Sequence, residues 1–148
     1  MRNIRIMYQY DGSKYYGFQR QKNKDTVQGD IEKIVFSKFN EKINMTSSGR
    51  TDRGVHALGQ VSNFSISKRI PLDAIKQQIN KTLRGKVKIL SIEEIHADFN
   101  ARFDAKRRTY LYVLKNESKI TPFEAPYVTS IKEEIDIDKL QLIFQPLT

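Results

Sequence analysis

Apolar and polar residues alternate along several short segments of the chain, which is the pattern of half-buried β-strands. Over residues 2–10, Ile4, Ile6, Tyr8 and Tyr10 would share one face. The same kind of pattern predicts strands over residues 42–47, 60–66, 87–95 and 108–115. Because one face of each strand is apolar and the other polar, we expect a sheet that is covered on one side only.

Between these strands, two segments repeat their apolar residues at helical spacing. The first helix opens at Asp25 or Thr26, and Asp25 followed by Gln28 three residues later fits a capping box. The second helix has Pro71 in its first turn, where proline is favoured, and Gly85 stops it.

The predicted order of elements is strand, helix, strand, strand, helix, strand. This is the split βαβ, or ferredoxin-like, arrangement of the α+β class. It predicts an antiparallel sheet with both helices on one face, and it leaves the other face free to bind a partner. Open sheets of this kind bind RNA in several protein modules.

Beyond these elements the pattern starts again, with the strand at 108–115 and a later helix capped by Asp136. We therefore expect a ferredoxin-like domain over residues 1–100 and an incomplete second, similar unit over residues 101–148. The chain would then end within a domain. The alternative is a short C-terminal extension that packs on the first unit.

The composition narrows the possible functions. The chain has 148 residues, with 26 Lys and Arg against 17 Asp and Glu, and a net charge of +9. Such an excess favours a polyanionic partner. The chain has no Cys and two His, which excludes disulfides, thiolate zinc sites, cysteine nucleophiles and sites with three imidazoles. Without a long apolar run or a signal sequence, we expect a cytoplasmic protein that makes no membrane contact.

A polar loop between two predicted strands carries the most informative residues. Three glycines in residues 48–60 bracket Arg50, Asp52 and Arg53. A neighbouring guanidinium favours an ionised carboxylate, so Asp52 would be a nucleophile or a base. The alternative is that Asp52 only forms a turn, as Asp often does in glycine-rich loops.

The two histidines give weaker signals. His56 could be a general acid or base, or a loop histidine bonded to the backbone, and we favour the structural role. His96 and Asp98 resemble a pair of metal ligands, but two ligands are a weak pattern, and we expect no metal. A metal-dependent nuclease that uses Asp52, His56 and Asp98 is a third functional alternative.

Two further segments mix aromatic side chains with basic and amide ones, over residues 10–21 and 102–110. This mixture suits stacking on bases combined with phosphate contacts. The side chains that we expect to contact RNA are Lys14, Phe18, Gln19, Arg20, Arg53, His56 and Arg102.

Taken together, these segments resemble the tRNA pseudouridine synthase A family. The resemblance lies in residues 49–57 (GRTDRGVHA), preceded by 10–12 (YDG) and 16–21 (YGFQRQ), and in 99–105 (FNARFDA) with 107–110 (RRTY). The motifs occur in the family's order. They cover essentially the whole chain, but they correspond only to the N-terminal part of the family's proteins.

The resemblance implies a fold of two ferredoxin-like halves and an enzyme that acts as a homodimer on tRNA, without cofactor or metal. The family isomerises uridines at positions 38–40 of the anticodon stem-loop. By resemblance, Asp52 is the catalytic aspartate, Arg50 is the arginine beside it, Tyr110 is the active-site tyrosine that packs on the target base, and Arg102 belongs to the RNA-binding cleft. The missing remainder of the second half would supply the other wall of the cleft, so we expect the chain alone to be inactive.

Four positions depart from the family pattern. Phe18 replaces a usual Trp, Arg53 a usual Ala, Asn100 a usual His, and Leu111 a usual Arg. The alternative from another functional class is a non-catalytic RNA-binding module on a ferredoxin-like sheet, in which Asp52 has only a turn role.

Overall fold

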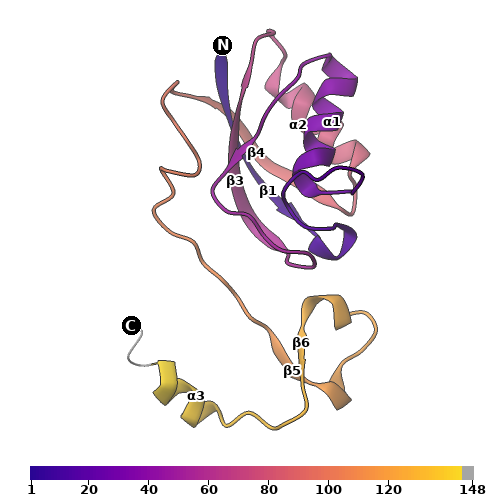
Figure 1. The fold of residues 1–148 in the computed structure, drawn as a ribbon, viewed down its shortest axis with the longest axis vertical. Coiled ribbons are helices and arrows are strands. Elements are labelled where there is room, and N and C mark those ends of the chain that lie inside the picture. The colour runs from indigo at the N-terminus through magenta and orange to yellow at the C-terminus, as the bar shows by residue number, and fades with distance from the viewer. Residues whose placement is uncertain (145–148) are drawn as a thin grey trace. The chain divides into compact units, whose positions relative to one another are not determined.

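The computed structural model describes residues 1–144 and contains two compact units (Figure 1). The first unit is Met1–Arg108 and the second starts at Thr109. We expected the division after residue 100, and the structure places it after Arg108. Each unit is described separately below.

The first unit is an antiparallel sheet with the strand order β2-β3-β1-β4. Its strands are β1 (Arg2–Tyr10), β2 (Thr46–Ser47), β3 (Ala57–Ile66) and β4 (Val87–Ile95), and its α-helices are α1 (Val27–Phe39) and α2 (Leu72–Thr82). With a helix after the first and third strands, this is the split βαβ order. The predicted α+β class and antiparallel sheet are confirmed.

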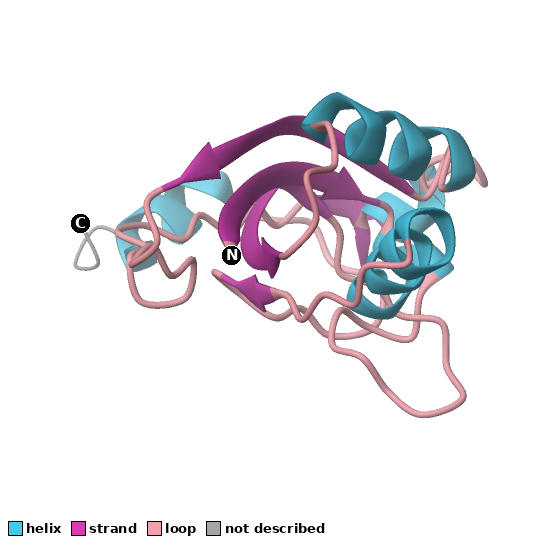
Figure 2. Cartoon of the chain, turned by 90° about the horizontal axis from the view of Figure 1, so that it is seen from above, coloured by secondary structure: helices cyan, strands magenta, loops and turns pink. Residues whose placement is uncertain are grey.

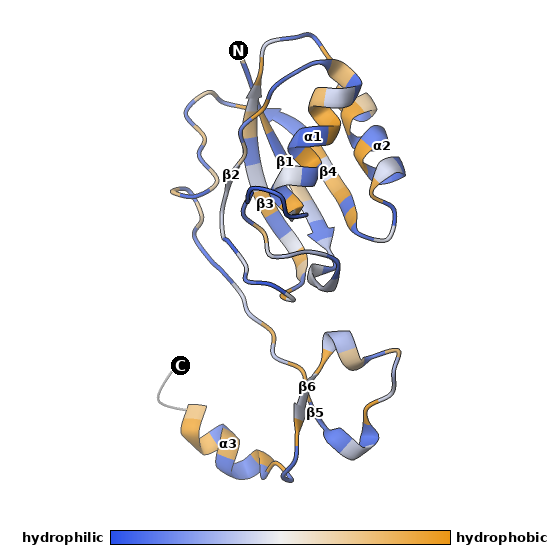
Figure 3. Cartoon of the chain, turned by 45° about the vertical axis from the view of Figure 1, so that its right-hand side comes forward, coloured by the Kyte–Doolittle hydropathy of each residue, from blue (hydrophilic) through white to orange (hydrophobic). Residues whose placement is uncertain are grey.

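The two helices lie together on one face of the sheet (Figures 1 and 2). Ile4, Ile6 and Tyr8 on β1 are completely buried in the core, together with Ile31 on α1 and Ile75 on α2. Orange and blue segments alternate along both helices in Figure 3, because each buries one apolar side and exposes the other. The alternation predicted for residues 2–10 is thus the direct result of this packing.

The prediction of a capping box formed by Asp25 and Gln28 at the start of α1 was wrong. Thr26 is the N-cap, and its Oγ1 accepts a hydrogen bond from Gly29 N–H at 3.2 Å. Gln28 is buried, so its side chain cannot reach back to the cap and instead bonds to Arg20 and Glu32. A buried Thr hydroxyl at the cap leaves no role for Asp25, which is exposed.

Three other element boundaries differ from the prediction. The strand at 42–47 is reduced to Thr46–Ser47, because only these two residues find partners on β3. β3 itself begins at Ala57, three residues earlier than expected, since Ala57 pairs with Tyr10. Pro71 lies at the N-cap of α2 and not in its first turn.

The second face of the sheet is partly covered, which corrects the expectation that it is free. Asn3 and Asn63, on neighbouring strands, both donate hydrogen bonds to Phe99 O, at 3.0 and 3.2 Å. Ala101 is buried, and its N–H donates to Asn63 Oδ1 at 2.9 Å. Residues 99–101 therefore close over these two asparagines.

The segment after β4 stays attached to the first unit as far as Arg108. The Arg108 Nε atom donates to Ser48 O at 2.6 Å, and its Nη2 atom donates to Arg102 O at 3.2 Å. These bonds explain why the unit extends eight residues beyond the predicted boundary. They also fix Arg102 beside the loop that contains Asp52.

The second unit contains short elements and no buried side chain among its described residues. They are β5 (Leu114–Asn116), η2 (Glu117–Lys119), η3 (Ala125–Tyr127), β6 (Thr129–Ile131) and α3 (Ile137–Phe144). β5 and β6 pair in parallel. Asp136 caps α3 as predicted, because its Oδ1 accepts from Lys139 N–H at 3.1 Å.

The strand predicted over residues 108–115 was wrong for most of its length. Only Leu114 and Lys115 of that range belong to β5, and the residues before them form no ladder within the described part of the chain. Alternation describes which faces a strand would have, but a strand also needs a partner for its backbone groups. Here β6 supplies a partner for three residues only.

Candidate functional site

The loop between β2 and β3 is held by the loop that follows β1. The Tyr10 hydroxyl lies 2.7 Å from Thr51 Oγ1, and Phe18 N–H donates to Thr51 O at 3.1 Å. Burial raises the pKa of Tyr10, and its bond to Thr51 opposes that rise. Thr51 is therefore fixed through both its side chain and its backbone, directly before Asp52.

Asp52 presents an exposed carboxylate. Its backbone oxygen accepts from Val55 N–H at 3.2 Å, which closes the turn. Among the described residues, the carboxylate itself makes no hydrogen bond or ion pair. In the turn alternative, a side-chain oxygen of Asp52 would bond its own backbone. The turn is instead closed by backbone atoms, so the carboxylate is available for other partners.

The two arginines beside Asp52 in the sequence contact residues of another loop. Arg50 Nη1 donates to Gln19 Oε1 at 3.1 Å. The Arg53 guanidinium lies over the ring of Tyr16, 4.7 Å from its centroid, in a cation–π contact. Both arginines thus join the Asp52 loop to the loop that follows β1.

His56 bonds to the backbone, as the loop-histidine interpretation requires, and the RNA contact that we also expect of it stays a prediction. Its Nδ1 atom accepts a hydrogen bond from Gly12 N–H at 3.0 Å. The same nitrogen lies 3.2 Å from Asp11 Oδ1, so the Asp11 carboxylate also lies against the imidazole. His56 therefore ties the end of the Asp52 loop to the backbone after β1.

Five of the predicted residues line one pocket in the first unit, with a volume of about 280 Å³. They are Phe18, Gln19, Arg20, Arg50 and Arg102. The other lining residues are Gln28, Asn44, Met45, Thr46 and Ser47. Three guanidinium groups on one pocket make it a suitable site for an anion such as a phosphate.

A buried carboxylate organises this pocket. The side chain of Glu32 on α1 is 8% exposed, and its Oε2 atom lies 2.5 Å from Arg20 Nη1. Its Oε1 atom accepts from Gln28 Nε2 and from Met45 N–H, both at 2.9 Å. A buried charge needs such partners. Glu32 therefore fixes Arg20, while much of the Arg20 side chain stays exposed.

The remaining predicted residues lie elsewhere or have another role. Phe18 is 2% exposed and packs 6.0 Å from the Tyr10 ring, so it shapes the pocket wall and offers no free face for stacking. Lys14 is exposed on η1 (Gly12–Lys14) and does not line the pocket. Tyr110 belongs to the second unit, where its side chain is 69% exposed.

Sequence reasoning missed that Glu32 and Gln28 form a buried, hydrogen-bonded polar pair. The available signal was their spacing, because two polar residues four positions apart fall on one side of a helix. Their neighbours Ile31 and Val35 are apolar and fully buried, which should have indicated a polar pair inside the core. Asn63, which holds the segment over the sheet, gave no comparable signal.

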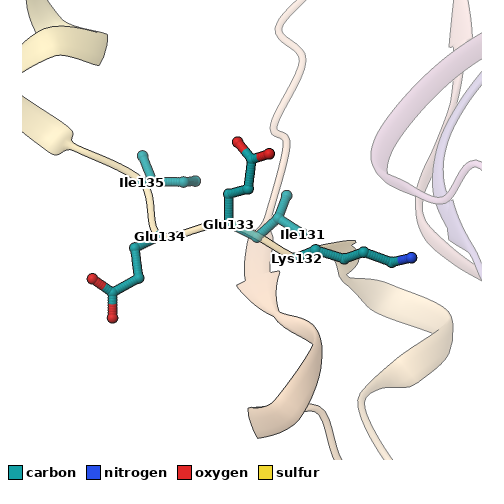
Figure 4. Close-up of a pocket in the computed structure, with 5 residues that line it drawn as sticks. All are labelled: Ile131, Lys132, Glu133, Glu134 and Ile135. Carbon is teal, nitrogen blue, oxygen red and sulfur yellow. The ribbon is translucent and has the colours of Figure 1, made fainter.

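A second hollow, of about 340 Å³, lies in the second unit and is lined by five consecutive residues, 131–135. Figure 4 shows that the carboxylates of Glu133 and Glu134 point in different directions there. Its side chains do not converge on a common point, so we assign it no function.

Within residues 1–144, no three His, Asp or Glu side chains come together as ligands for a metal ion. The same residues include no helix with the length and apolar character needed to span a bilayer.

The loop that carries Asp52 lies within the part of the chain that matches a known family. The family model for tRNA pseudouridine synthase matches residues 6–104, which include the Asp52 loop, the loop after β1 and the segment with Arg102. The chain belongs to the tRNA pseudouridine synthase family. The match ends before Tyr110, so it bears directly on the first unit.

Individual relatives extend the similarity along most of the chain. A protein named tRNA pseudouridine synthase A from Caldicellulosiruptor bescii is 40% identical over 141 residues, 95% of this chain and 58% of the relative. Proteins of the same name from Dictyoglomus thermophilum (42% identical; 96% of this chain, 59% of the relative) and Solibacter usitatus (44%; 86% and 53%) are similar. The chain spans somewhat more than half the length of these relatives.

Proposed function

We propose that this chain contributes the aspartate-bearing part of a tRNA pseudouridine synthase, which converts uridine to pseudouridine in the anticodon stem-loop of tRNA. One observation carries the proposal. The carboxylate of Asp52 is exposed and unpaired among the described residues, while the residue before it is held through two hydrogen bonds. A rigid loop that presents a free carboxylate is what a catalytic aspartate requires.

The reaction balances without an oxidant, a reductant or a second substrate. The bond between C1′ and N1 of the uridine breaks, and a bond between C1′ and C5 forms. The proton on C5 is lost to solvent and N1 gains one. Asp52 serves either as a nucleophile towards the sugar or the ring, or as a base that removes a sugar proton.

The target base has to leave the helical stack to reach Asp52, at a cost of a few kcal/mol. Tyr110 offsets part of this cost by stacking on the base, which contributes about 1–3 kcal/mol. The exposed ring of Tyr110 is consistent with this role. Arg20, Arg50 and Arg102 in the pocket hold backbone phosphates near the flipped nucleotide.

We extend the proposal to the assembly. Over residues 109–144 many apolar side chains are exposed, including Leu111, Tyr112, Phe123, Leu142 and Phe144. Such surface favours association. In this proposal, these side chains are covered by the region that the relatives carry beyond the matched part and by a second copy, in a cytoplasmic homodimer. Residues 101–148 then contribute to a second ferredoxin-like half, and the chain alone turns over little or no tRNA.

The experiment follows the C5 proton. An extended protein, in which the chain is continued by the region that the relatives carry beyond the match, is given tRNA tritiated at uridine C5. Tritium release reports the isomerisation, and Asp52→Asn should reduce its rate by on the order of 10³-fold or more. Asp98→Asn, which removes an exposed carboxylate of the same type, is the control and should retain the rate.

Three results would count against the proposal. Full tritium release by Asp52→Asn removes the aspartate from the chemistry. Tight tRNA binding by the extended protein without any tritium release favours the RNA-binding module instead. Turnover by the chain alone at the rate of the extended protein contradicts the incomplete-site part of the proposal.

A further inference from the structure

The hydroxyl of Tyr10 is the only side-chain group among the described residues that bonds the side chain of Thr51. The distance of 2.7 Å is that of a good hydrogen bond between hydroxyl groups. Because Thr51 directly precedes Asp52, the orientation of Thr51 sets the direction in which the Asp52 side chain leaves the backbone. A group that fixes Thr51 therefore acts on Asp52 without touching it.

We propose that Tyr10 is the positioning residue for Asp52, and that it acts by holding Thr51 through its hydroxyl group. This inference rests on the proposed catalytic role of Asp52. It gives Tyr10 a function that its place in the apolar pattern of β1 does not suggest.

The surroundings of Tyr10 suit this role. The residue is 4% exposed, and its ring lies 6.0 Å from both the Tyr8 and Phe18 rings. A tyrosine side chain that is packed in this way has few alternative rotamers. The hydroxyl therefore has a fixed position relative to β1, which pairs with strands on both sides.

A second contact acts on the same residue from the loop that follows β1. Phe18 N–H donates to Thr51 O, so Thr51 is bonded on its side chain and on its carbonyl. The Tyr10 bond is the one of the two that a side-chain substitution can remove cleanly. Since burial raises the pKa of Tyr10, its hydroxyl stays protonated at neutral pH, and removing it should leave the shape of the pH–rate profile unchanged.

The chain offers a matched control on the same strand. Tyr8 is also buried, lies on the same face of β1, and bonds Ser62 Oγ through its hydroxyl at 2.8 Å. Tyr8→Phe removes a buried hydroxyl just as Tyr10→Phe does. Both variants remove a buried hydroxyl, but only the hydroxyl of Tyr10 bonds to Thr51, next to Asp52.

The first measurement needs no activity. In the chain itself, Tyr10→Phe should speed hydrogen exchange at Phe18 and Val55 N–H, which bond to Thr51 O and Asp52 O, by about tenfold relative to the global change. Tyr8→Phe should change exchange at these two amides only as far as it changes exchange throughout the core.

The second measurement uses the extended protein and tritium release from tRNA. Tyr10→Phe should lower kcat by on the order of tenfold or more, because small displacements of a reacting group have large effects on rate. KM for tRNA should stay within about twofold, since the phosphate-binding pocket is untouched. Tyr8→Phe should retain kcat.

Substitution at Thr51 tests the same bond from the other side. Thr51→Ser keeps the hydroxyl and should retain kcat, whereas Thr51→Val should match Tyr10→Phe. The double variant Tyr10→Phe/Thr51→Val should be no slower than either single variant, because both remove one shared bond.

The inference is overturned if Tyr10→Phe leaves both the exchange rates and kcat at the level of Tyr8→Phe. It is also overturned if the decrease in kcat of the double variant is the product of the decreases in the two single variants. An extended protein that releases no tritium at all defeats the proposed function, and the exchange measurement still decides whether Tyr10 orders the loop. If Tyr10→Phe fails to fold, the Thr51→Ser and Thr51→Val pair gives the same decision.

Discussion

Gly12 and Val55 are in direct backbone contact, because a Cβ atom built on Gly12 would lie 1.9 Å from the Val55 carbonyl oxygen. No side chain can move aside to make room, since the three nearest atoms all belong to the Val55 backbone. The loop after β1 and the loop that carries Asp52 are therefore packed together at a point where only glycine fits.

We expect Gly12→Ala to push these two loops apart. The substitution should lower the free energy of unfolding by about 1–3 kcal/mol, as overpacking generally does. It should also break the bond from Gly12 N–H to His56 Nδ1. Chemical denaturation measures the first effect, and the imidazole signals of His56 in an NMR spectrum measure the second.

Gly59→Ala is the control, because a Cβ atom at Gly59 meets no atom within 4 Å and the residue lies in β3. Alanine is better than glycine in a strand, so this variant should be as stable as the parent protein or more so. Equal stability of Gly12→Ala and the parent would show that the loops are not packed as described.

The pocket arginines should differ in their contribution to RNA binding. Among residues 1–144, the guanidinium of Arg50 bonds only the neutral amide of Gln19, whereas Arg20 is paired with the buried Glu32. The logarithm of the binding constant falls as the logarithm of the salt concentration rises, and each phosphate contact makes this decrease steeper by about 0.7–0.9. Arg50→Gln should make the salt dependence of tRNA binding less steep by about that amount, and Arg20→Gln should have a smaller effect.

Arg84→Gln is the control for this series, because it removes the same charge from an exposed position after α2 and away from the pocket. Its salt dependence should match that of the parent protein. Equal effects of Arg50→Gln, Arg20→Gln and Arg84→Gln would mean that the net charge attracts tRNA and the pocket makes no specific contact.

Much of the first unit could be predicted from the sequence, because its strands and helices bury one face each and their apolar residues recur at the matching spacing. β1 and β4 have the predicted bounds, since each has one face in the core and a partner along its length. The predicted strand before Leu114 failed for the opposite reason. It has the alternation of a strand, but among the described residues its ladder with β6 begins only at Leu114, preceded by a single bond from Thr129 N–H to Val113 O.

For the candidate site, the sequence predicted several of the residues that belong to it but not how they contact one another. Motifs identified the loop of Asp52 and the basic residues around it, but not which side chain bonds which. Arg50 contacts Gln19, which lies 31 positions earlier in the sequence. Glu32 joins Arg20 to Met45 inside the core. Contacts of this kind depend on how three separate segments pack, and no local pattern carries that information.

Glu41 should make the stability of the first unit depend on pH in the acidic range. The backbone N–H of Ser67, at 2.7 Å, lowers the pKa of the Glu41 carboxyl below its ordinary value of 4.5. A lowered pKa in the folded state means that the carboxylate stabilises the fold fully above pH 4.5. That contribution is then lost as the pH falls towards the lowered pKa.

We therefore expect Glu41→Gln to be less stable than the parent at neutral pH, with a difference that shrinks as the pH falls below 4.5. Urea denaturation at a series of pH values measures this. Glu133→Gln, an exposed glutamate of the second unit, should change the free energy of unfolding by less than about 0.5 kcal/mol. A Glu41→Gln difference that stays constant from pH 7 to pH 3 would contradict the role of the Ser67 bond.

The position of the boundary between the two units can be tested with two fragments. Every fully buried apolar side chain of the described chain belongs to residues 1–108, and the ion pair and hydrogen bonds of the pocket do as well. A fragment of residues 1–108 should therefore unfold at the same denaturant concentration as the whole chain.

A fragment of residues 1–100 should be less stable by about 1–3 kcal/mol, the cost of leaving a buried polar group unsatisfied. It lacks Ala101, whose N–H satisfies Asn63 Oδ1, and Arg108, whose guanidinium bonds Ser48 O. Ala101→Gly in the longer fragment keeps the backbone bond and should cost less than the truncation. Equal unfolding midpoints for the two fragments would place the boundary at residue 100 after all, and would mean that the segment over Asn63 contributes nothing to the fold.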